Sequence, residues 1–172
     1  TIMGNNPSKI KDDNYPITNV SWFDCQTFIK KLNDITGLEF RLPTEAEWEF
    51  AAKGGQKGKR NGYKYSGSNT ITNIMWYSKN SGNRPHEVSS KQSNELGLFD
   101  MSGNVWEWCS DWYAPYDIKH SFSPNGPTNG TEKVCRGGSF MSEAKECRVS
   151  IREKDMPNEI SEDVGFRLVL AE

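Results

Sequence analysis

The residues with the most evident capacity for chemistry lie in one short segment, 97–108, which reads GLFDMSGNVWEW. Two carboxylates, Asp100 and Glu107, flank a tight Gly103-Asn104 turn, and two tryptophans end the segment. A turn rich in carboxylate and carbonyl oxygens can hold a hard cation, and neighbouring indoles can anchor it to a core. The same pattern fits a plain hairpin turn beside a buried aromatic strand, so that alternative stays open.

The four cysteines do not form a recognisable metal motif, because no pair has a close spacing such as C-x-x-C. Cys25 falls on the apolar side of a predicted helix, and Cys109 follows the aromatic segment, so both are expected in the core. Cys135 and Cys147 flank an RGGSF turn. They could form a disulfide if the protein is exported, but the sequence does not give their separation.

Length and charge limit the possible functions. The chain of 172 residues has room for one domain, 1–172, with a single sizeable core. The net charge is −2 with both signs interspersed, which argues against nucleic-acid binding. No apolar run approaches the roughly 20 residues that cross a bilayer. The sequence begins at Thr1 and shows no signal peptide, so we expect a processed or excised chain.

Two helices are predicted in the first third of the chain. Ser21 is a good N-cap, apolar residues recur after it at helical spacing, and Gly37 is well placed to end the helix. Thr44 and Glu47 form a capping box for a second helix, 45–53. Its three glutamates are expected to support the helix dipole and to face solvent, rather than to form a catalytic pair.

The remaining sequence predicts short strands joined by long loops. Residues 55–94 are polar and rich in turn residues, with a short strand or sheet edge expected at 74–77. The best strand candidates are residues 96–108, 134–140, 147–152 and 164–170. Residues 114–131 are rich in Pro, Gly and Asn and are expected to form a surface loop. Few regular elements around two helices indicate an α+β fold.

Four arginines recur near the C-terminal strand candidates: Arg136, Arg148, Arg152 and Arg167. They could clamp anions or carboxylates. Buried salt bridges are the favoured interpretation, with partners such as Glu107, Asp111 or Asp163, because arginine is the usual choice for such pairs. The two histidines, His86 and His120, lie in loop-like regions and are expected at the surface, so no iron site is predicted.

Four blocks of sequence resemble the formylglycine-generating-enzyme, or sulfatase-modifying-factor, family. They read NVSWFDC (19–25), RLPTEAEWEFAAKGG (41–55), GLFDMSGNVWEW (97–108) and CRGGSF…CRVSIRE…VGFRL (135–168). They follow the family's order and span nearly the whole chain. The resemblance implies the formylglycine-generating-enzyme fold, a C-type-lectin-like variant with two helices, several short antiparallel strands and many loops.

The resemblance also carries expectations about what surrounds the chain. It implies that N-terminal strands of the family domain, several tens of residues, are missing before the opening TIMGNNPSKI. The family's distribution favours a bacterial source and an extracytoplasmic location, either periplasmic or at the cell surface.

Calcium is the cofactor that the resemblance implies. The family's calcium motif maps onto Asp100, Gly103, Val105 and Glu107. The two acidic residues would bind through carboxylates and the other two through main-chain carbonyls. The family position held here by Asp100 is aspartate or asparagine, and aspartate adds charge that favours a divalent cation. A possible second site begins at Asn73-Ile74, but its other ligands do not map clearly.

The family's founding activity, as the resemblance implies, is the copper-dependent oxidation of a sulfatase cysteine to formylglycine by molecular oxygen. Its catalytic pair consists of two cysteines after the GGS turn. Here the first position is Ser142 and the second is Cys147. A hydroxyl is a poor ligand for Cu(I), so copper is not expected and formylglycine generation is not predicted. Cys135 could supply a second sulfur only in a different geometry.

Two functions are therefore compared. The favoured one is a calcium-stabilised, non-catalytic binding or scaffold module that recognises a protein or peptide partner through loops 114–131 and 141–163. The alternative is an enzyme, either a formylglycine-generating or divergent oxidase or a metal-free maturation enzyme, that uses Cys147. A deep pocket ending at Cys147 would favour the enzyme, and a shallow polar surface there would favour binding.

Overall fold

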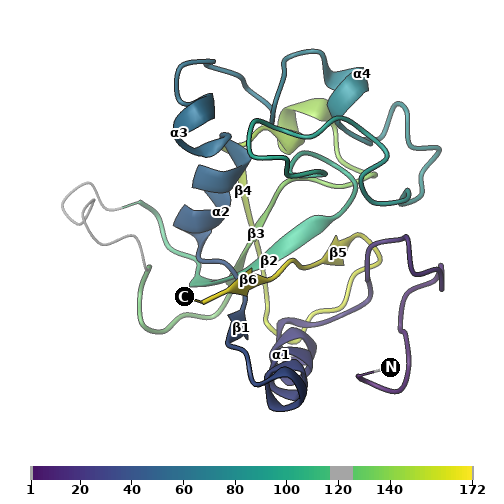
Figure 1. Cartoon of the computed structure of the whole chain (residues 1–172), viewed down its shortest axis with the longest axis vertical. Helices are drawn as coiled ribbons and strands as arrows, with labels where there is room; N and C mark the ends of the chain where they lie inside the picture. The colour runs from purple at the N-terminus through teal and green to yellow at the C-terminus, as the bar shows by residue number, and fades with distance from the viewer. Residues whose placement is uncertain (1, 117–125, 172) are drawn as a thin grey trace.

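The computed structural model describes residues 2–116 and 126–171, and all structural statements concern these residues. The helices are α1 (Trp22–Thr36), α2 (Glu45–Ala52), and the single-turn α3 (Gly55–Gly58) and α4 (Ile71–Ile74), with a 3₁₀ helix at Ala144–Cys147. The strands are β1 (Phe40–Arg41), β2 (Trp106–Trp112), β3 (Lys133–Arg136), β4 (Arg152–Asp155), β5 (Val164–Gly165) and β6 (Val169–Leu170). Figure 1 shows the strands crossing the middle of the molecule.

Local capping signals set the two longer helices. The Ser21 hydroxyl accepts from the backbone N–H of Asp24 (3.1 Å), and the Asp24 carboxylate accepts from the N–H of Ser21 (2.9 Å). At the other end of α1, Gly37 takes a left-handed φ of 69° and its N–H donates to the Asn33 carbonyl. The same box between Thr44 and Glu47 starts α2, which ends one residue before the predicted end.

The four-stranded sheet has the order β4-β3-β2-β5. β2 and β3 are antiparallel, with Glu107 opposite Arg136, whereas β2 and β5 are parallel, with Trp106 opposite Val164. Among the described residues, the pairings β2-β3, β3-β4 and β1-β6 are antiparallel, as the family resemblance implied, and the β2-β5 pairing is parallel. A separate two-stranded sheet pairs β1 with β6. These pairings place β5 beside β2, from the middle of the sequence, and β6 beside β1, from the first third of the sequence (Figure 1).

Two of the predicted strands are shorter than expected. The strand predicted at 96–108 begins only at Trp106, because Asp100 (φ 57°), Gly103 (φ 78°) and Asn104 (φ 66°) take left-handed conformations that no strand accommodates. The strand predicted at 134–140 ends at Arg136, since the two glycines that follow also have positive φ.

The other strand predictions also need correction. Residues 164–170 split into β5 and β6, which belong to different sheets. The segment 147–152 holds the end of the 3₁₀ helix and only the first residue of β4. No strand forms at 74–77 in the described chain, because Ile74 closes α4 instead. The fold class, α+β, is nevertheless as predicted.

The sheet separates two parts of the core. One cluster packs α1 against the sheet through residues such as Cys25, Trp108 and Cys135. The other packs α2 against the opposite face through residues that include Trp48, Cys109 and Val134. Neighbouring residues in β2 and in β3 therefore point to opposite faces, as expected for a strand. In the described residues, no helix is long and apolar enough to cross a membrane.

Buried salt bridges tie α2 to the sheet. Arg136 is fully buried and contacts the carboxylates of Glu45 and Glu49. Arg152 donates to both oxygens of Glu45 (2.6 and 2.7 Å). The prediction that arginines form buried salt bridges is confirmed here, but the prediction that the glutamates of α2 face solvent is wrong for Glu45, which is 7% exposed. Arg148 instead donates to a backbone carbonyl.

Candidate functional site

The turn at Gly103 and Asn104 is fixed by backbone contacts with two other segments. The N–H of Gly103 donates to the Gly137 carbonyl (2.9 Å), and the N–H of Asn104 donates to the Trp76 carbonyl (2.9 Å). A Cβ on Gly103 would lie 2.2 Å from that Trp76 oxygen, so only glycine fits at this position. The carbonyl of Asn104 in turn accepts from the N–H of Phe140 (2.7 Å). The turn is therefore built into the core.

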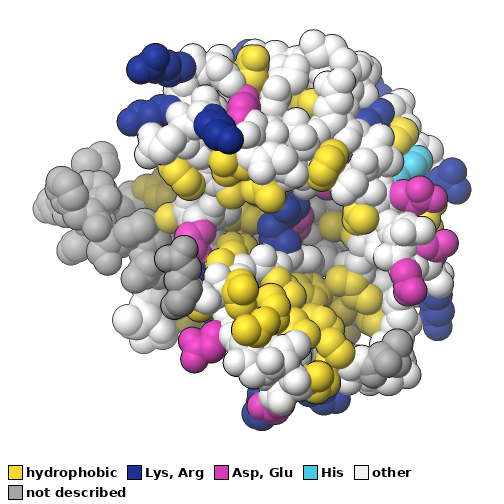
Figure 2. Space-filling model, in the orientation of Figure 1, with side chains coloured by type: hydrophobic (Ala, Val, Ile, Leu, Met, Phe, Trp, Pro, Cys, Tyr) yellow, Lys and Arg dark blue, Asp and Glu magenta, His cyan; other side chains and the backbone are white. Residues whose placement is uncertain are grey.

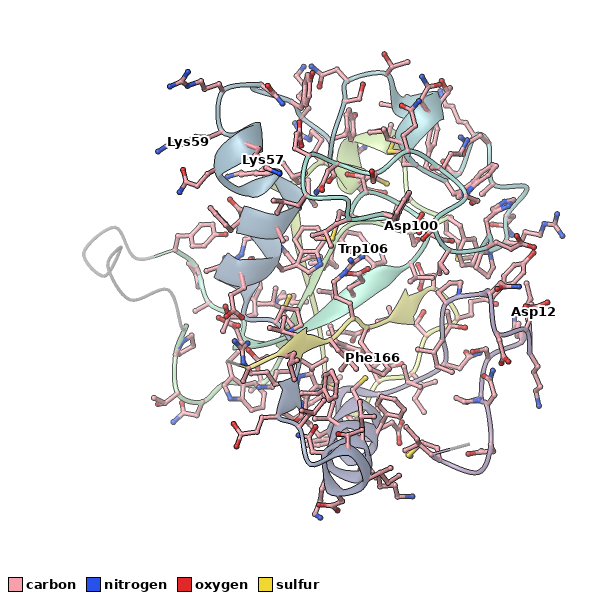
Figure 3. The ribbon with its side chains drawn as sticks, in the orientation of Figure 1. Asp12, Lys57, Lys59, Asp100, Trp106 and Phe166 are labelled. Carbon is pink, nitrogen blue, oxygen red and sulfur yellow. The ribbon has the colours of Figure 1, made fainter. Side chains whose placement is uncertain are left out.

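Asp100 offers an oxygen that has no partner. Its Oδ2 accepts from the backbone N–H of Ser89 (2.8 Å), whereas its Oδ1 is buried and has no hydrogen-bond partner. Burial raises the pKa of the Asp100 carboxyl above its ordinary value, and the nearby charge of Glu107 acts in the same direction. Figure 3 shows Asp100 close to the start of β2, near Trp106. A buried, unpaired carboxylate oxygen is a candidate cation ligand.

Glu107 lies on β2 and is 5% exposed. Its Oε2 accepts from the indole Nε1 of Trp48 (2.6 Å) and from Nε of Arg167 (2.6 Å), and its Oε1 accepts from Nη2 of Arg167 (2.6 Å). The same Nη2 donates to the Phe99 carbonyl (3.1 Å). Arg167 therefore confirms the predicted salt bridge with Glu107, and it holds this carboxylate beside the 97–105 turn.

The donor set has the chemistry that a hard cation such as calcium requires. A carboxylate has about four acceptor positions, and three hydrogen bonds leave Glu107 room for one more on Oε1. Asp100 adds a second negative charge and its unpaired Oδ1, against the single positive charge of Arg167. The predicted carbonyl ligands, Gly103 and Val105, belong to the same buried turn. No group of three or more His, Cys, Asp or Glu side chains suited to a metal occurs among the described residues, so the carbonyls are essential to any site here.

The second predicted calcium site has less geometric support. Asn73 lies on α4, where its backbone carbonyl already accepts from the N–H of Gln92 (2.9 Å). The ammonium group of Lys91 donates to the neighbouring Thr72 carbonyl (2.7 Å), and a positive charge there disfavours a cation. Ile74 is buried in an apolar cluster.

Ser142 closes the turn that follows the two glycines. Its Oγ accepts from the backbone N–H of Ser139 (3.0 Å) and lies 3.3 Å from the Ser139 hydroxyl. Its own N–H donates back to the Ser139 carbonyl (3.1 Å). The Ser139 hydroxyl also donates to the carboxylate of Asp163 (2.8 Å). The hydroxyl at the first family position thus serves as a local hydrogen-bond acceptor in a buried turn.

Cys147 ends the 3₁₀ helix and has no exposed surface. It packs with Ile74, Met75 and Tyr77 in an apolar cluster. A Cβ on Gly138 would lie 2.5 Å from the Cys147 sulfur, so the thiol is sealed against that backbone. Burial, with a smaller contribution from Glu146, raises the pKa of the Cys147 thiol to about 12.

The four cysteines are all free and buried. Cys135 belongs to the cluster between α1 and the sheet, whereas Cys147 belongs to the cluster near α4. The disulfide alternative is therefore not adopted, and Cys135 does not stand beside Cys147 as a second sulfur ligand. Cys25 and Cys109 are core residues, as predicted.

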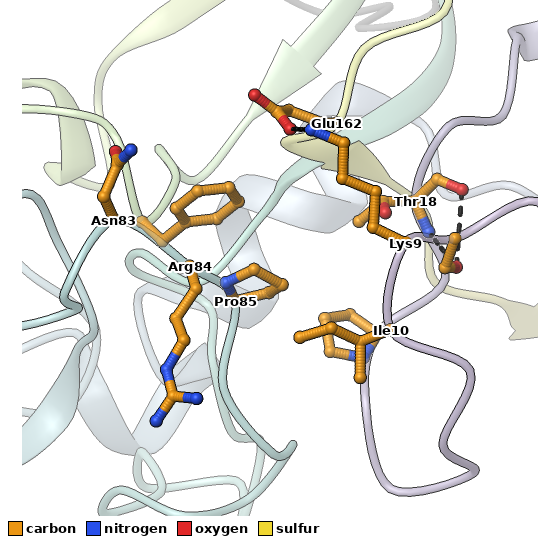
Figure 4. Close-up of a pocket in the computed structure, with 10 residues that line it drawn as sticks. Lys9, Ile10, Thr18, Asn83, Arg84, Pro85 and Glu162 are labelled. Atoms are coloured by element: carbon orange, nitrogen blue, oxygen red, sulfur yellow. Dashed lines mark hydrogen bonds and ion pairs between the residues drawn. The ribbon is translucent and has the colours of Figure 1, made fainter.

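A cavity of about 250 Å³ is lined by four parts of the chain: residues 8–18, residues 83–85, Phe140 and Glu162 (Figure 4). Its lining residues include Ile10, Thr18, Arg84 and Phe140, and the ion pair between Lys9 and Glu162 closes one side. Cys147 is not among its lining residues, so this cavity does not lead to the thiol. It does include part of the predicted recognition loop 141–163.

Two other predictions concern the loops. His86 is half-buried rather than free in solvent, because its ring stacks on Trp76 (3.7 Å between centroids) and its Nε2 lies 2.7 Å from the Ser81 carbonyl oxygen. His120 lies outside the described residues, as does much of the predicted recognition loop 114–131.

The chain belongs to the family described as the sulfatase-modifying factor enzyme 1-like domain, whose model matches residues 2–172. This confirms the family and the fold that the four sequence blocks predicted. A formylglycine-generating enzyme from Streptomyces coelicolor is 36% identical over 173 residues, which cover 90% of this chain and 52% of the enzyme. The chain thus spans about half the length of that enzyme.

Two further relatives carry other names. A chaperone protein LppX from Paenibacillus barcinonensis is 31% identical over 218 residues, which cover 98% of this chain and 74% of the relative. The solved structure of Treponema denticola variable protein 1 superimposes with a TM-score of 0.89 at 35% identity, covering 97% of this chain and 78% of that one. The family's fold therefore occurs under names that do not refer to formylglycine.

Proposed function

We propose that this chain is a calcium-stabilised domain of the sulfatase-modifying-factor family that acts as a non-catalytic binding or scaffold module. One observation carries the proposal. The first thiol of the family pair is replaced by Ser142, whose hydroxyl already accepts the N–H of Ser139, and the second, Cys147, is sealed in an apolar cluster. The proposal therefore assigns these two residues to structure.

The chemistry of Cu(I) supports this assignment. Copper(I) prefers soft thiolate ligands, and a hydroxyl does not replace one. With a pKa of about 12 for Cys147, the thiolate fraction at pH 7 is on the order of 10⁻⁵. Binding copper would have to deprotonate this thiol and also open its contacts with Met75 and Tyr77. Copper binding would therefore require two unfavourable steps and would gain only one soft ligand.

The acidic turn, defined as residues 100–107, supports a structural role for calcium. When bound, the ion would supply positive charge to a buried site that holds two carboxylates and one guanidinium. Asp100 would contribute its unpaired Oδ1 and Glu107 its remaining acceptor position. Because this turn also contacts Gly137 and Phe140, holding it would steady the surface beside the 250 Å³ cavity.

The cavity beside Phe140 is the candidate recognition surface of this module. Its walls combine apolar side chains, such as Ile10, with the charged side chains of Arg84 and Glu162. A mixture of this kind suits a protein or peptide partner better than a small apolar ligand. Of the two predicted recognition loops, 141–163 contributes Glu162 to this cavity, and loop 114–131 stays a separate proposal.

A copper and turnover experiment separates this proposal from the enzyme alternative. Cu(I) would be titrated into the wild-type chain, and a cysteine-containing sulfatase-motif peptide would be incubated with it in oxygenated buffer and analysed for the aldehyde by mass spectrometry. We expect neither tight copper binding nor product. Ser142→Cys is the matched variant, and we expect it to bind Cu(I) at least about tenfold more tightly because it restores the second sulfur.

Two outcomes would overturn the proposal. Aldehyde formed by the wild-type chain and lost in Cys147→Ala would establish an enzyme that works with one family cysteine. A melting temperature that does not rise with calcium, measured against a chelator control, would remove the cation from the proposed role.

A further inference from the structure

A basic surface lies at the end of α2 and over α3, away from the acidic turn. Between Glu49 and Glu87 the sequence contains no acidic residue but seven lysines and arginines, in a chain whose net charge is −2. Five of them belong to this surface: Lys53, Lys57, Lys59, Arg60 and Lys64. The rest of the chain therefore carries a net charge of −7. Figure 2 shows dark blue side chains gathered at this corner, with hydrophobic side chains below them. Such a separation of charge is a candidate electrostatic footprint for an acidic partner.

Beneath these charges is a cavity of about 470 Å³. Three aromatic side chains line it, and two of them are unusually exposed: Phe50 is 52% exposed and Tyr63 is 41% exposed, while Tyr65 is half-buried. Lys53 and Lys59 also contribute to the lining. Exposed aromatic rings beside cations are typical of the energetic centre of a binding surface.

The cations around this cavity are available to a partner. Lys53 is paired with Glu49 on α2. The other four, Lys57, Lys59, Arg60 and Lys64, are exposed and form no salt bridge with any residue that the structure describes. In Figure 3, Lys57 and Lys59 project outward from α3 and the residue after it.

The cavity is preformed. A Cβ on Gly58 would lie 1.9 Å from the Lys53 carbonyl oxygen, so the chain packs closely at its floor. The loop that follows is anchored at both ends, because the Asn61 amide donates to Glu95 and the Lys64 carbonyl accepts from the N–H of Val149 (3.0 Å). A rigid surface loses little entropy when a partner binds.

We propose that this surface, defined by Phe50, Tyr63, Lys57, Lys59 and Arg60, binds an acidic peptide segment. An apolar or aromatic side chain of the segment would enter the cavity between the two rings, and flanking carboxylates would face the cations. The charges are complementary, and the aromatic contacts supply affinity that charge pairs at a rim do not.

The lining favours a peptide over other anions. Gln56 is the single amide among the lining residues, which include no Asp, Asn or Glu to accept hydrogen bonds from sugar hydroxyls. A nucleic acid would have to run beyond the cavity, and each further phosphate would meet a surface whose remaining charge is strongly negative. A short acidic segment avoids that repulsion.

This inference goes beyond the proposed function, since it holds whether or not Cys147 takes part in catalysis and whether or not calcium binds. Its test uses the whole chain and a fluorescein-labelled peptide with a central tryptophan flanked by glutamates. Fluorescence anisotropy would compare it with the analogue in which glutamines replace the glutamates. We expect the acidic peptide to bind at least about tenfold more tightly, and more weakly as salt is added.

Matched variants locate the site. We expect Lys57→Glu/Lys59→Glu/Arg60→Glu to weaken binding at least about tenfold, and Lys11→Glu/Lys30→Glu/Lys31→Glu to leave it within about twofold. Phe50→Ala should also weaken binding about tenfold, whereas Phe23→Ala, which removes an equally exposed phenylalanine on α1, should not. All these side chains are exposed, so the variants are expected to fold, and melting temperatures check this.

Three results would overturn the inference. The first is equal binding of the acidic peptide and its glutamine analogue. The second is equal weakening by the two charge-reversal variants, which would mean that only net charge matters. The third is displacement of the peptide by an oligothymidylate that itself binds more tightly, which would assign the surface to nucleic acid. None of these results bears on copper binding or turnover, so the two proposals fail separately.

Discussion

The acidic turn and the GGS segment, residues 137–147, hold the two sets of residues that could do chemistry. Both are buried, and burial raises the pKa of Asp100 as it does that of Cys147, but the charges around the two sites differ. In the turn, Asp100 and Glu107 face one guanidinium, so two carboxylates share a single positive charge, and the proposed calcium ion would supply the missing charge. In the GGS segment, Cys147 has apolar neighbours and no cation, so its thiol stays neutral. The comparison teaches that burial alone favours the neutral form of a group, and that a buried group stays ionised only where an opposite charge lies beside it.

The two regions are also in direct contact. The N–H of Gly103 reaches the Gly137 carbonyl, and the Asn104 carbonyl accepts from Phe140. A substitution in one region can therefore alter the structure of the other. The stability of each variant must be measured together with its metal binding or thiol reactivity.

The largest effect is expected from Glu107→Ala in the acidic turn. The substitution leaves the Arg167 guanidinium largely buried without its carboxylate and removes the acceptor of the Trp48 indole N–H. We expect the free energy of unfolding to fall by about 3–5 kcal/mol. Denaturant unfolding in the presence of a calcium chelator measures this loss without any contribution from the ion.

Asp34→Ala is the control for that variant, because it removes an exposed pair with Lys30 on α1. We expect a change of at most about 0.5 kcal/mol. Similar losses in the two variants would mean that the buried pair is no stronger than a surface pair, and the contrast drawn for the acidic turn would be lost.

For the GGS segment we predict the opposite behaviour: the Cys147 thiol does not react. At pH 8, a thiol with a pKa of about 12 is ionised about a thousandfold less than one at its ordinary value of 9.0. We expect iodoacetamide to modify Cys147 at least a thousandfold more slowly in the folded chain than in urea. Peptide mapping by mass spectrometry follows the site directly.

The dependence of folding stability on pH has a definite sign. The folded state raises the pKa of Cys147, so it favours the neutral thiol, and this stabilisation is fully present below pH 9.0 and is lost as the pH rises toward about 12. Stability should fall over that range, and Cys147→Ala should reduce the fall. Rapid alkylation of Cys147 in the folded chain at pH 8 would show instead an accessible thiolate and would favour the enzyme alternative.

The helices were predictable because their signals are local. Ser21 with Asp24, and Thr44 with Glu47, form capping boxes that involve neighbours only, and Gly37 ends α1 by its own left-handed conformation. The strand expected at 96–108 was wrong for a complementary reason. Apolar residues there suggested an extended chain, but contacts with distant segments hold Asp100 and the turn in conformations that sequence spacing does not reveal.

In the candidate site, too, what could be predicted depended on whether the signal is local or comes from distant residues. Spacing alone left the turn open between a cation site and a plain hairpin, and its calcium ligands were implied only by the family resemblance. The partners of Glu107 were partly predicted: Arg167 was expected in a salt bridge, and the indole of Trp48 was not identified. Glu45 was misassigned to solvent because its partner Arg152 lies far along the chain. Pairings of this kind depend on tertiary structure, and an excess of arginines was the only local sign of them.

A smaller effect is expected from Ser142→Ala in the GGS segment. The variant leaves the buried N–H of Ser139 without its side-chain acceptor, so the free energy of unfolding should fall by about 1 kcal/mol. Copper affinity should not change, because the hydroxyl is not assigned to a metal. Ser150→Ala, at an exposed position, should change stability by less than about 0.5 kcal/mol. Loss of copper binding in Ser142→Ala would assign the hydroxyl to a metal site after all.

The smallest change in stability, and the sharpest test of the acidic turn, is expected from Asp100→Asn. In the presence of a chelator the variant should be within about 0.5 kcal/mol of the wild type, because it removes a buried charge whose Oδ1 has no partner. With calcium the variant should lose affinity by about tenfold, since it retains an oxygen but not the charge, and this reduces the stabilisation at saturating ion by about 1.4 kcal/mol. Calorimetric titration and melting curves at several calcium concentrations measure both quantities. Equal calcium affinities in the two proteins would show that the unpaired oxygen of Asp100 is not a ligand, and the acidic turn would then be as purely structural as the GGS segment.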